Sequence, residues 1–316
     1  MRAVSAARAT GTANIAEIRL PFPVDVRLTL SSHGRGSGDP TFQVDAAGAV
    51  WRTSLTPDGP ATIRILAAEP GGTVTAHAWG PGAGWLLGAL PAALGLYDDI
   101  SAFDPDGHPV LRNAARRHPG FRVGRTGRVM EALVPAILEQ KVVSLEAHRA
   151  WRILLGRYGS TPPGPAPRGM RVFPPPRTWR SIPSWEWHQA GVEGVRAQTI
   201  IRAATVAGRL ELLLDLPGTE AARKLRSIDG IGPWTAAETL QRAAGDADAV
   251  SVGDYNLPNA VGWALAGRPR TDDTAMLALL EPYRGHRYRV TRLVELGGLH
   301  PPRHGPRLPA SDYRAF

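Results

Sequence analysis

An aspartate behind a loop of small residues is the first candidate for chemistry in this chain of 316 residues. Asp254 follows residues 250–253, which read VSVG, and precedes a helix that we predict over residues 256–266. A carboxylate in such a place can stabilise a developing positive charge or take a proton from water. On base rates an aspartate ahead of a helix is more often an N-cap than a catalyst. Position alone therefore favours the N-cap.

A tight turn with two glycines precedes this aspartate. Residues 225–236 read LRSIDGIGPWTA, and Gly230 and Gly232 separate two predicted helices too closely for an ordinary polar loop. Glycine after one helix and proline at the start of the next are common helix punctuation, which is the structural interpretation. The functional interpretation is that two glycines let backbone amides approach a phosphate, beside the positive end of the next helix. Such contacts hold DNA without reading its sequence.

The choice of catalytic groups in this chain is narrow. The chain has no cysteine, which excludes disulfides, thiolate metal sites and thiol nucleophiles. Lysine occurs only at Lys141 and Lys224. Any catalysis must therefore come from carboxylates, histidines, hydroxyls or these few amines, and we expect no catalytic metal.

Positive charge gathers in the second part of the chain. The formal net charge is +9, but residues 1–110 hold 7 Lys+Arg against 10 Asp+Glu, which leaves 30 against 18 for residues 111–316. A basic surface favours a polyanionic partner. If that partner is DNA, we expect residues 111–316 to bind it.

The elements that must position these residues change in type along the chain. Alternating and β-branched stretches predict strands between residues 18 and 79, including 24–30 and 62–66, with a hairpin of 42–45 and 50–54. Beyond residue 110 the apolar period is helical, and residues 161–167 are an expected exposed connector. The helices that we predict there cover residues 129–138, 151–158, 198–206, 219–227 with Thr219 as N-cap, 234–244, 256–266, 272–280 and 287–296.

These elements predict an α+β fold in four parts. An N-terminal tail of residues 1–14 precedes a β-rich accessory domain over 15–110, which has an antiparallel sheet with helices. An all-α region of two helical subdomains follows over 111–300, and 301–316 form a C-terminal tail.

Residues 228–236, IDGIGPWTA, resemble the hairpin of the helix-hairpin-helix DNA glycosylase superfamily, specifically its alkylated-base branch, the DNA-3-methyladenine glycosylase II group. Residues 136–144, AILEQKVVS, resemble the family segment after the first long helix, where a side chain enters the duplex. Residues 157–159, 172–175 and 281–287 resemble further landmarks. The β-rich start is similar to the family's accessory domain, so the resemblance covers roughly residues 15 to 300. It implies that residues 111–300 are a helix-hairpin-helix glycosylase region.

The resemblance also implies roles for single residues. Asp254 matches the catalytic aspartate, which assists the hydrolytic release of a base that has been flipped out of the duplex. Trp234 and Tyr255 match base-stacking aromatics of the base pocket, although core packing is the ordinary role of a tryptophan inside a helix. Glu238 stands where the family has another pocket aromatic, and Arg292 falls near the position of one more. The residues that match DNA contacts are Gly230, Ile231, Gly232, Thr235, Lys224, Gln140 and Lys141, of which Gln140 and Lys141 occupy the place of the inserted wedge.

Family members that also cut the strand carry a lysine in the helix after the hairpin, where this chain has Trp234. We therefore expect a monofunctional glycosylase that hydrolyses damaged, alkylated purines and starts base-excision repair. Glu238 makes the pocket more polar, so excision of deaminated or oxidised purines, such as the neutral base hypoxanthine, is an alternative. A non-catalytic damage-sensing or architectural DNA-binding protein is the alternative from another class.

The expected partner is double-stranded DNA containing a damaged base. We expect no cofactor; the resemblance implies at most a monovalent cation at the hairpin carbonyls. The chain has no apolar run of membrane-spanning length and no secretory signal pattern near Met1, so we expect a cytoplasmic monomer, nucleoid-associated in a bacterium.

Overall fold

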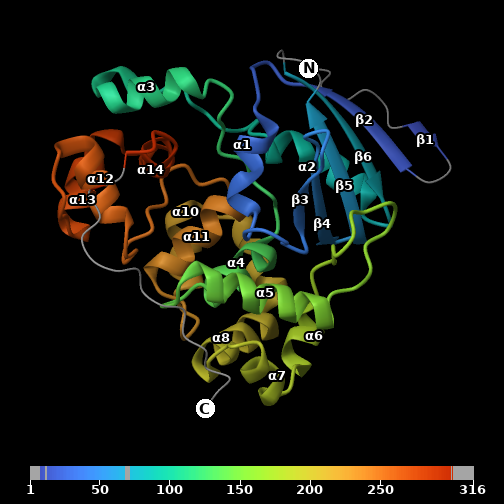
Figure 1. Cartoon of the computed structure of the whole chain (residues 1–316). Helices are drawn as coiled ribbons and strands as arrows, with labels where there is room; N and C mark the ends of the chain where they lie inside the picture. Colours follow the sequence, from blue (N-terminus) through green and yellow to red (C-terminus); the bar gives the residue numbers. More distant parts are fainter. Residues whose placement is uncertain (1–7, 11–12, 68–71, 300, 302–316) are drawn as a thin grey trace.

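An antiparallel sheet forms the N-terminal part of the protein and helices form the rest (Figure 1). The computed structural model describes residues 8–10, 13–67, 72–299 and 301. Its strands run in the order β1-β2-β6-β5-β4-β3. Their bounds are β1 Arg8–Thr10, β2 Ala13–Arg19, β3 Phe42–Val44, β4 Val50–Thr56, β5 Gly59–Ala67 and β6 Thr73–Trp79. The sheet thus begins within residues 1–14, where the sequence predicted a tail, whereas residues 302–316 lie outside the described part.

The two faces of the sheet are covered by different parts of the chain. Helix α2 (Ala83–Ala93) packs on one face, over the alternate residues of the strands that point inward. On the opposite face Trp51 and Trp79 stack with ring centroids 5.6 Å apart, and Met170 joins them in a small core. A Cβ on Gly164 would lie 2.3 Å from Trp79, so the segment around Gly164 packs directly on this pair. The predicted connector over residues 161–167 is exposed or half-buried throughout, and at Gly164 it also lies over the two tryptophans.

Two further local predictions were wrong. Residues 24–30 were predicted as a strand, but α1 (Val26–Leu30) is a short helix whose start is capped by Asp25, which accepts from the Leu28 amide at 2.9 Å. Alternating apolar residues over so short a stretch fit either period, and the cap decides between them. Thr219 was predicted as an N-cap, yet α10 (Gly218–Leu225) begins after Pro217 with no side-chain cap.

The hairpin of β3 and β4 and the strand over residues 62–66 are confirmed, and so are the predicted helices. The other helices are α3 Pro109–Arg117, α4 Val129–Leu138, α5 Ser144–Tyr158, α6 Pro176–Ser181, α7 Ser184–Gln189, α8 Gly194–Thr205, α9 Ala207–Glu211, α11 Pro233–Ala243, α12 Leu257–Ala266, α13 Asp273–Leu280 and α14 Arg287–Leu296. Short 3-10 turns are η1 Ser31–His33, η2 Pro105–Gly107, η3 Leu212–Asp215 and η4 Glu281–Tyr283. The structure therefore has the α+β class that the sequence predicts.

The helices enclose two apolar cores. One core lies among α4, α5, α6, α7, α8, α10 and α11, and Trp179 is fully buried in it. The other lies among α3, α12, α13 and α14. Since α11 belongs to the first core and α12 to the second, the segment between them crosses from one to the other. No helix of the described residues is long and apolar enough to cross a membrane.

Buried charged contacts join the sheet layer to the helices. Arg35, just after η1, donates to Glu139 at 3.0 Å, and the His148 imidazole lies 3.6 Å from the same carboxylate. Burial by itself raises the pKa of Glu139. The charge of Arg35, the hydrogen bond with His148 and the charge of Arg242 together outweigh burial and lower the pKa to about 2. Because Glu139 directly precedes Gln140, this contact also fixes the end of α4 relative to the sheet.

We predict that Glu139→Gln destabilises the protein by about 3 kcal/mol at neutral pH, because it leaves the buried Arg35 charge uncompensated. The folded-state pKa of Glu139 lies below the unfolded value of about 4.3, so the stabilisation is present above that value and is lost as the pH falls towards 2. Urea unfolding followed by tryptophan fluorescence over pH 2–7 measures it. A stability difference that does not shrink over the acid range contradicts the assignment.

Candidate active site

The hairpin between α10 and α11 turns on two glycines of different geometry. Gly230 has φ +92°, and a Cβ there would lie 2.1 Å from the Thr199 hydroxyl of α8. Gly232 is extended at the start of α11, and a Cβ there would meet nothing within 4 Å. The amides of Gly230 and Gly232 donate to no acceptor among the described residues. Their N–H groups, with the positive end of α11, form a surface that suits an anion.

Gln140 brings the predicted wedge segment against this hairpin. Its side-chain amide donates to the Gly230 carbonyl at 2.9 Å and to the Thr235 hydroxyl at 2.8 Å. Lys141 follows with φ +54°, the one non-glycine residue of the described chain in the left-handed region, and its side chain is exposed. A strained, exposed tip between α4 and α5 therefore stands beside the hairpin.

The side chains of the remaining predicted DNA contacts, Ile231, Thr235 and Lys224, all contact other residues of the chain. Ile231 is 5% exposed and packs into the helical core, and the buried Thr235 hydroxyl accepts from Gln140, so neither side chain is presented at the surface of the hairpin. Lys224 lies on α10, 3.8 Å from Glu220. The carbonyls of Leu225, Ile228 and Gly230 already accept N–H donors, so a cation there would have to use their second lone pairs. Among the described residues no group of three or more His, Asp and Glu could hold a metal.

Asp254 both caps a helix and faces the hairpin helix. One carboxylate oxygen accepts from the amides of Asn256 and Leu257, at 2.8 and 2.9 Å, at the start of α12. The other oxygen accepts from the Trp234 indole N–H at 3.0 Å. The carboxylate is half-buried. Three donors hold it in one orientation, and a carboxylate has about four acceptor positions, so room remains for a ligand. The capping and functional interpretations are thus compatible.

The other predicted pocket residues divide into two groups. Trp234 is half-buried on α11, whereas Tyr255 is 80% exposed. Glu238, one turn after Trp234, accepts from the Ser251 hydroxyl at 2.5 Å and pairs with Arg242 at 2.7 Å. Tyr255 is therefore not brought into the contacts that join Trp234, Glu238 and the loop before Asp254.

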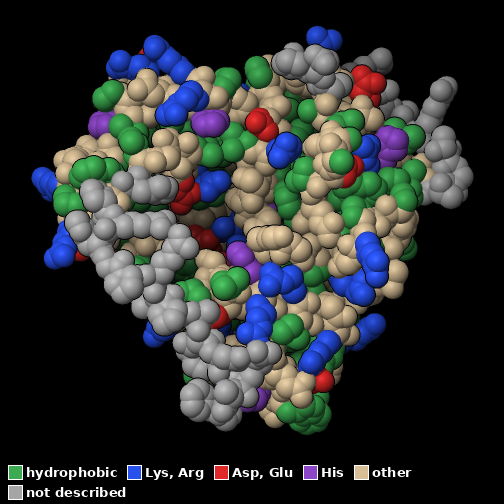
Figure 2. Space-filling view, in the orientation of Figure 1, with side chains coloured by type: hydrophobic (Ala, Val, Ile, Leu, Met, Phe, Trp, Pro, Cys, Tyr) green, Lys and Arg blue, Asp and Glu red, His purple; other side chains and the backbone are tan. Residues whose placement is uncertain are grey.

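Arg242 and Ser251, which were not predicted from the sequence, complete this row of contacts. The spacing of Glu238 and Arg242, four residues apart on a helix, was a signal for the ion pair. Arg292, named as a departure from the family, pairs with Glu295 on α14. Figure 2 shows the face over α11 hollowed near its centre, with acidic, basic and histidine side chains recessed in the hollow.

Solved structures share this architecture. A 3-methyladenine DNA glycosylase from Archaeoglobus fulgidus is 21% identical and superposes with a TM-score of 0.75 over 89% of this chain and 98% of its own. An 8-oxoguanine glycosylase/lyase from Clostridium acetobutylicum is 12% identical in its apo-form, with a TM-score of 0.70 over 93% of this chain and 99% of its own. The same enzyme in complex with double-stranded DNA containing cytosine opposite 8-oxoguanine is 11% identical, with a TM-score of 0.70 over 94% and 98%. This chain has the helix-hairpin-helix DNA glycosylase fold.

No family model and no curated protein matches the chain by sequence. The likeness therefore lies in the fold, which includes the sheet as well as the helices, since each glycosylase structure is covered almost completely. In this glycosylase fold the hairpin, the segment of Gln140 and the loop of Asp254 converge on the N-terminal half of α11.

We predict opposite results for alanine at the two hairpin glycines. Gly230→Ala should destabilise the protein by about 1–3 kcal/mol, because its backbone is in the left-handed region and Thr199 leaves no space. Gly232→Ala is the matched control and should change the free energy of unfolding by at most about 0.5 kcal/mol. Urea unfolding measures both, and equal losses would show that Thr199 does not restrict the turn.

Proposed function

We propose that this protein is a monofunctional DNA glycosylase that flips a damaged purine out of double-stranded DNA and releases it by hydrolysis. The observation that carries the proposal is the Asp254 carboxylate, held by Trp234 and the start of α12 beside the hairpin. The fold supports it, since the solved structures with this architecture include glycosylases of 3-methyladenine and of 8-oxoguanine.

The chemistry needs one fixed carboxylate. Breaking the bond between base and deoxyribose builds positive charge on the sugar, and a carboxylate beside the sugar stabilises that charge. Water then attacks C1′ and loses a proton to Asp254 or to solvent. A carboxylate and water complete this sequence, so the proposal includes no cofactor.

The hairpin supplies the proposed grip on DNA. The free amides of Gly230 and Gly232 can bind phosphate, and Gln140 and Lys141 stand where a side chain can fill the gap left by the flipped base. The aliphatic stem of Lys141 can insert while its ammonium reaches a phosphate. We propose that a monomer binds one damaged site at a time.

Alkylated purines are the substrates that the resemblance implies, and deaminated or oxidised purines are the alternative. An alkylated purine is already cationic and leaves readily, so it asks for little beyond Asp254. A neutral base leaves less readily and needs help from the pocket. The polar contacts of Glu238 with Ser251 and Arg242 bear on this choice.

We predict that Asp254→Asn lowers single-turnover base release by on the order of 100-fold or more while DNA binding persists. The measurement uses duplexes that each carry one defined lesion, with release detected by alkaline cleavage and binding by fluorescence anisotropy. Asn256 offers a control, because Asn256→Ala leaves the carboxylate and its three donors in place. A protein that binds these duplexes but releases no base from any of them is the non-catalytic alternative.

A second prediction concerns strand cleavage. A glycosylase that also cuts the strand attacks the sugar with an amine, and this chain offers only Lys141 and Lys224. Neither lysine lies on α11, and Trp234 occupies the start of that helix. Borohydride added during turnover should therefore trap no covalent enzyme–DNA adduct. An adduct that disappears in Lys141→Arg or Lys224→Arg would identify a lyase and refute the monofunctional assignment.

A further inference from the structure

Arg242 lies on α11 two turns beyond Trp234 and is fixed from two sides. Its Nη1 donates to the Glu238 carboxylate at 2.7 Å and to the Glu238 carbonyl at 2.9 Å. Its Nε donates to the carbonyl of Ser32, in η1 of the accessory domain, at 2.8 Å. Nη2 makes no hydrogen bond with any residue that the structure describes. An oriented guanidinium therefore keeps N–H donors for a ligand.

Glu238 places an acceptor beside these donors. One of its oxygens accepts from Ser251 and the other from Arg242, which leaves lone pairs on the carboxylate. Its side chain is 14% exposed and that of Arg242 is 13% exposed, so the pair is largely removed from water without being sealed. The carboxylate also raises the pKa of the Arg242 guanidinium, against the lowering effect of burial.

The Glu238–Arg242 pair lies about one purine length from Asp254 along α11. Glu238 follows Trp234 by one helical turn, about 6 Å along the axis of α11. The guanidinium of Arg242 reaches back to this level, and Ser251, which contacts Glu238, belongs to the loop that carries Asp254. A purine whose sugar bond lies at Asp254 and whose ring lies along Trp234 would bring its far edge to the pair.

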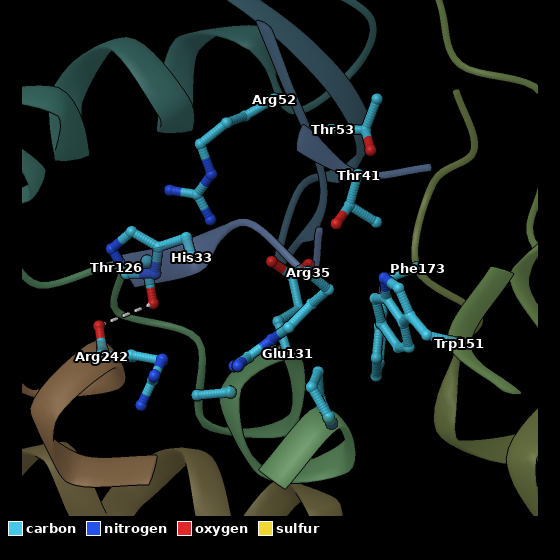
Figure 3. Close-up of a pocket in the computed structure, with 12 residues that line it drawn as sticks. His33, Arg35, Thr41, Arg52, Thr53, Thr126, Glu131, Trp151, Phe173 and Arg242 are labelled. Carbon is cyan, nitrogen blue, oxygen red and sulfur yellow. Dashed lines mark hydrogen bonds between the residues drawn. The ribbon is translucent and has the colours of Figure 1, made fainter. Parts of the chain in front are cut away.

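A small cavity next to the pair keeps its surroundings polar but closed. Figure 3 shows His33 and Arg52 around this cavity, with the Thr126 hydroxyl bonded to the carbonyl of Arg242. Its volume is about 30 Å³, room for roughly one water and not for a base. Burial holds the pKa of His33 well below its usual value, and the positive charges of neighbouring arginines, of which Arg52 has the largest effect, lower it further. Because the cavity is too small for a base, a bound base must lie on the Asp254 side of Arg242.

We propose that Arg242 binds the far edge of the flipped base and stabilises that base as it leaves, with Glu238 accepting from a ring N–H. The proposal rests on the proposed glycosylase function and names its substrates: neutral damaged purines whose edge offers an adjacent acceptor and donor, as the six-membered ring of hypoxanthine does. The Glu238–Arg242 pair has no net charge, so it gives a cationic purine no advantage.

The reaction balances with these groups. The bond between N9 and C1′ breaks and both of its electrons go to the base, which becomes an anion, while C1′ becomes cationic beside Asp254. Water adds to C1′ and its proton goes to the Asp254 carboxylate or to solvent. The donors of Arg242 share the negative charge of the leaving base, which then takes a proton from solvent.

The test compares two bases that share the O6 acceptor and the N1–H donor and differ in charge. Duplexes carry either hypoxanthine, which is neutral, or 7-methylguanine, which is cationic, and single-turnover release is measured for the wild type and for Arg242→Met. We expect the wild type to release hypoxanthine. Arg242→Met should slow that release by on the order of 100-fold, with a much smaller effect on 7-methylguanine.

The ratio of the hypoxanthine rate to the 7-methylguanine rate is measured on one preparation, so a loss of folded protein affects both rates equally and cancels. Glu238→Gln is a second variant that keeps the size of the side chain, and it should lower the ratio in the same direction. Arg180→Met, an exposed arginine on α6, is the matched control and should leave the ratio unchanged. Equal slowing of both bases by Arg242→Met would make Arg242 a structural residue and overturn the proposal.

Release of 7-methylguanine without hypoxanthine by the wild type also overturns the proposal, but leaves the glycosylase function intact. Release of neither base, nor of any base in the lesion panel, means that the glycosylase function itself has failed. The wild-type result separates these cases, and in the first of them Asp254→Asn should still remove the release of 7-methylguanine.

Discussion

The hydrogen bond from the Trp234 indole to Asp254 joins two regions that the chain builds separately. Trp234 lies in the first turn of α11, which packs in the first helical core, and Asp254 precedes α12, which packs in the second. Because Gln140 fixes the hairpin to the end of α4, and Glu139 fixes that end to Arg35 of the accessory domain, the orientation of one carboxylate is tied to three packed layers. A site held in this way loses little freedom when a ligand binds.

Much of this architecture could be predicted from the sequence, because the helical period is strong where helices are long. The helices over residues 129–138 and 287–296 carry their apolar residues on one face, and the hairpin of β3 and β4 alternates cleanly. The errors fall on short segments. Residues 24–30 have too few turns to separate the two periods, and an aspartate cap outside the pattern made them helical.

The site was predictable where its residues are close in sequence. Asp254 and Trp234 were singled out because both follow the hairpin closely, and the structure brings their side chains into contact. The contact of Arg242 with Ser32 joins residues 210 positions apart, and no local pattern carries such information. The cover over Trp51 and Trp79 escaped prediction for the same reason, since a proline-rich segment looks like a linker until the surface beneath it is known.

The Glu238–Arg242 pair is difficult to explain by stability. A largely buried ion pair gains Coulomb energy but loses hydration, and apolar side chains of similar size are often as stable or more so. Nη2 of Arg242 also has no hydrogen-bond partner among the described residues, so it contributes no such bond to the stability of the fold. A pair that apolar side chains could often equal in stability, yet that is fixed by Ser32 and by the loop of Asp254, is better explained by what it can bind. Polar groups that stay oriented before a ligand arrives are the arrangement that stabilises charge as it forms.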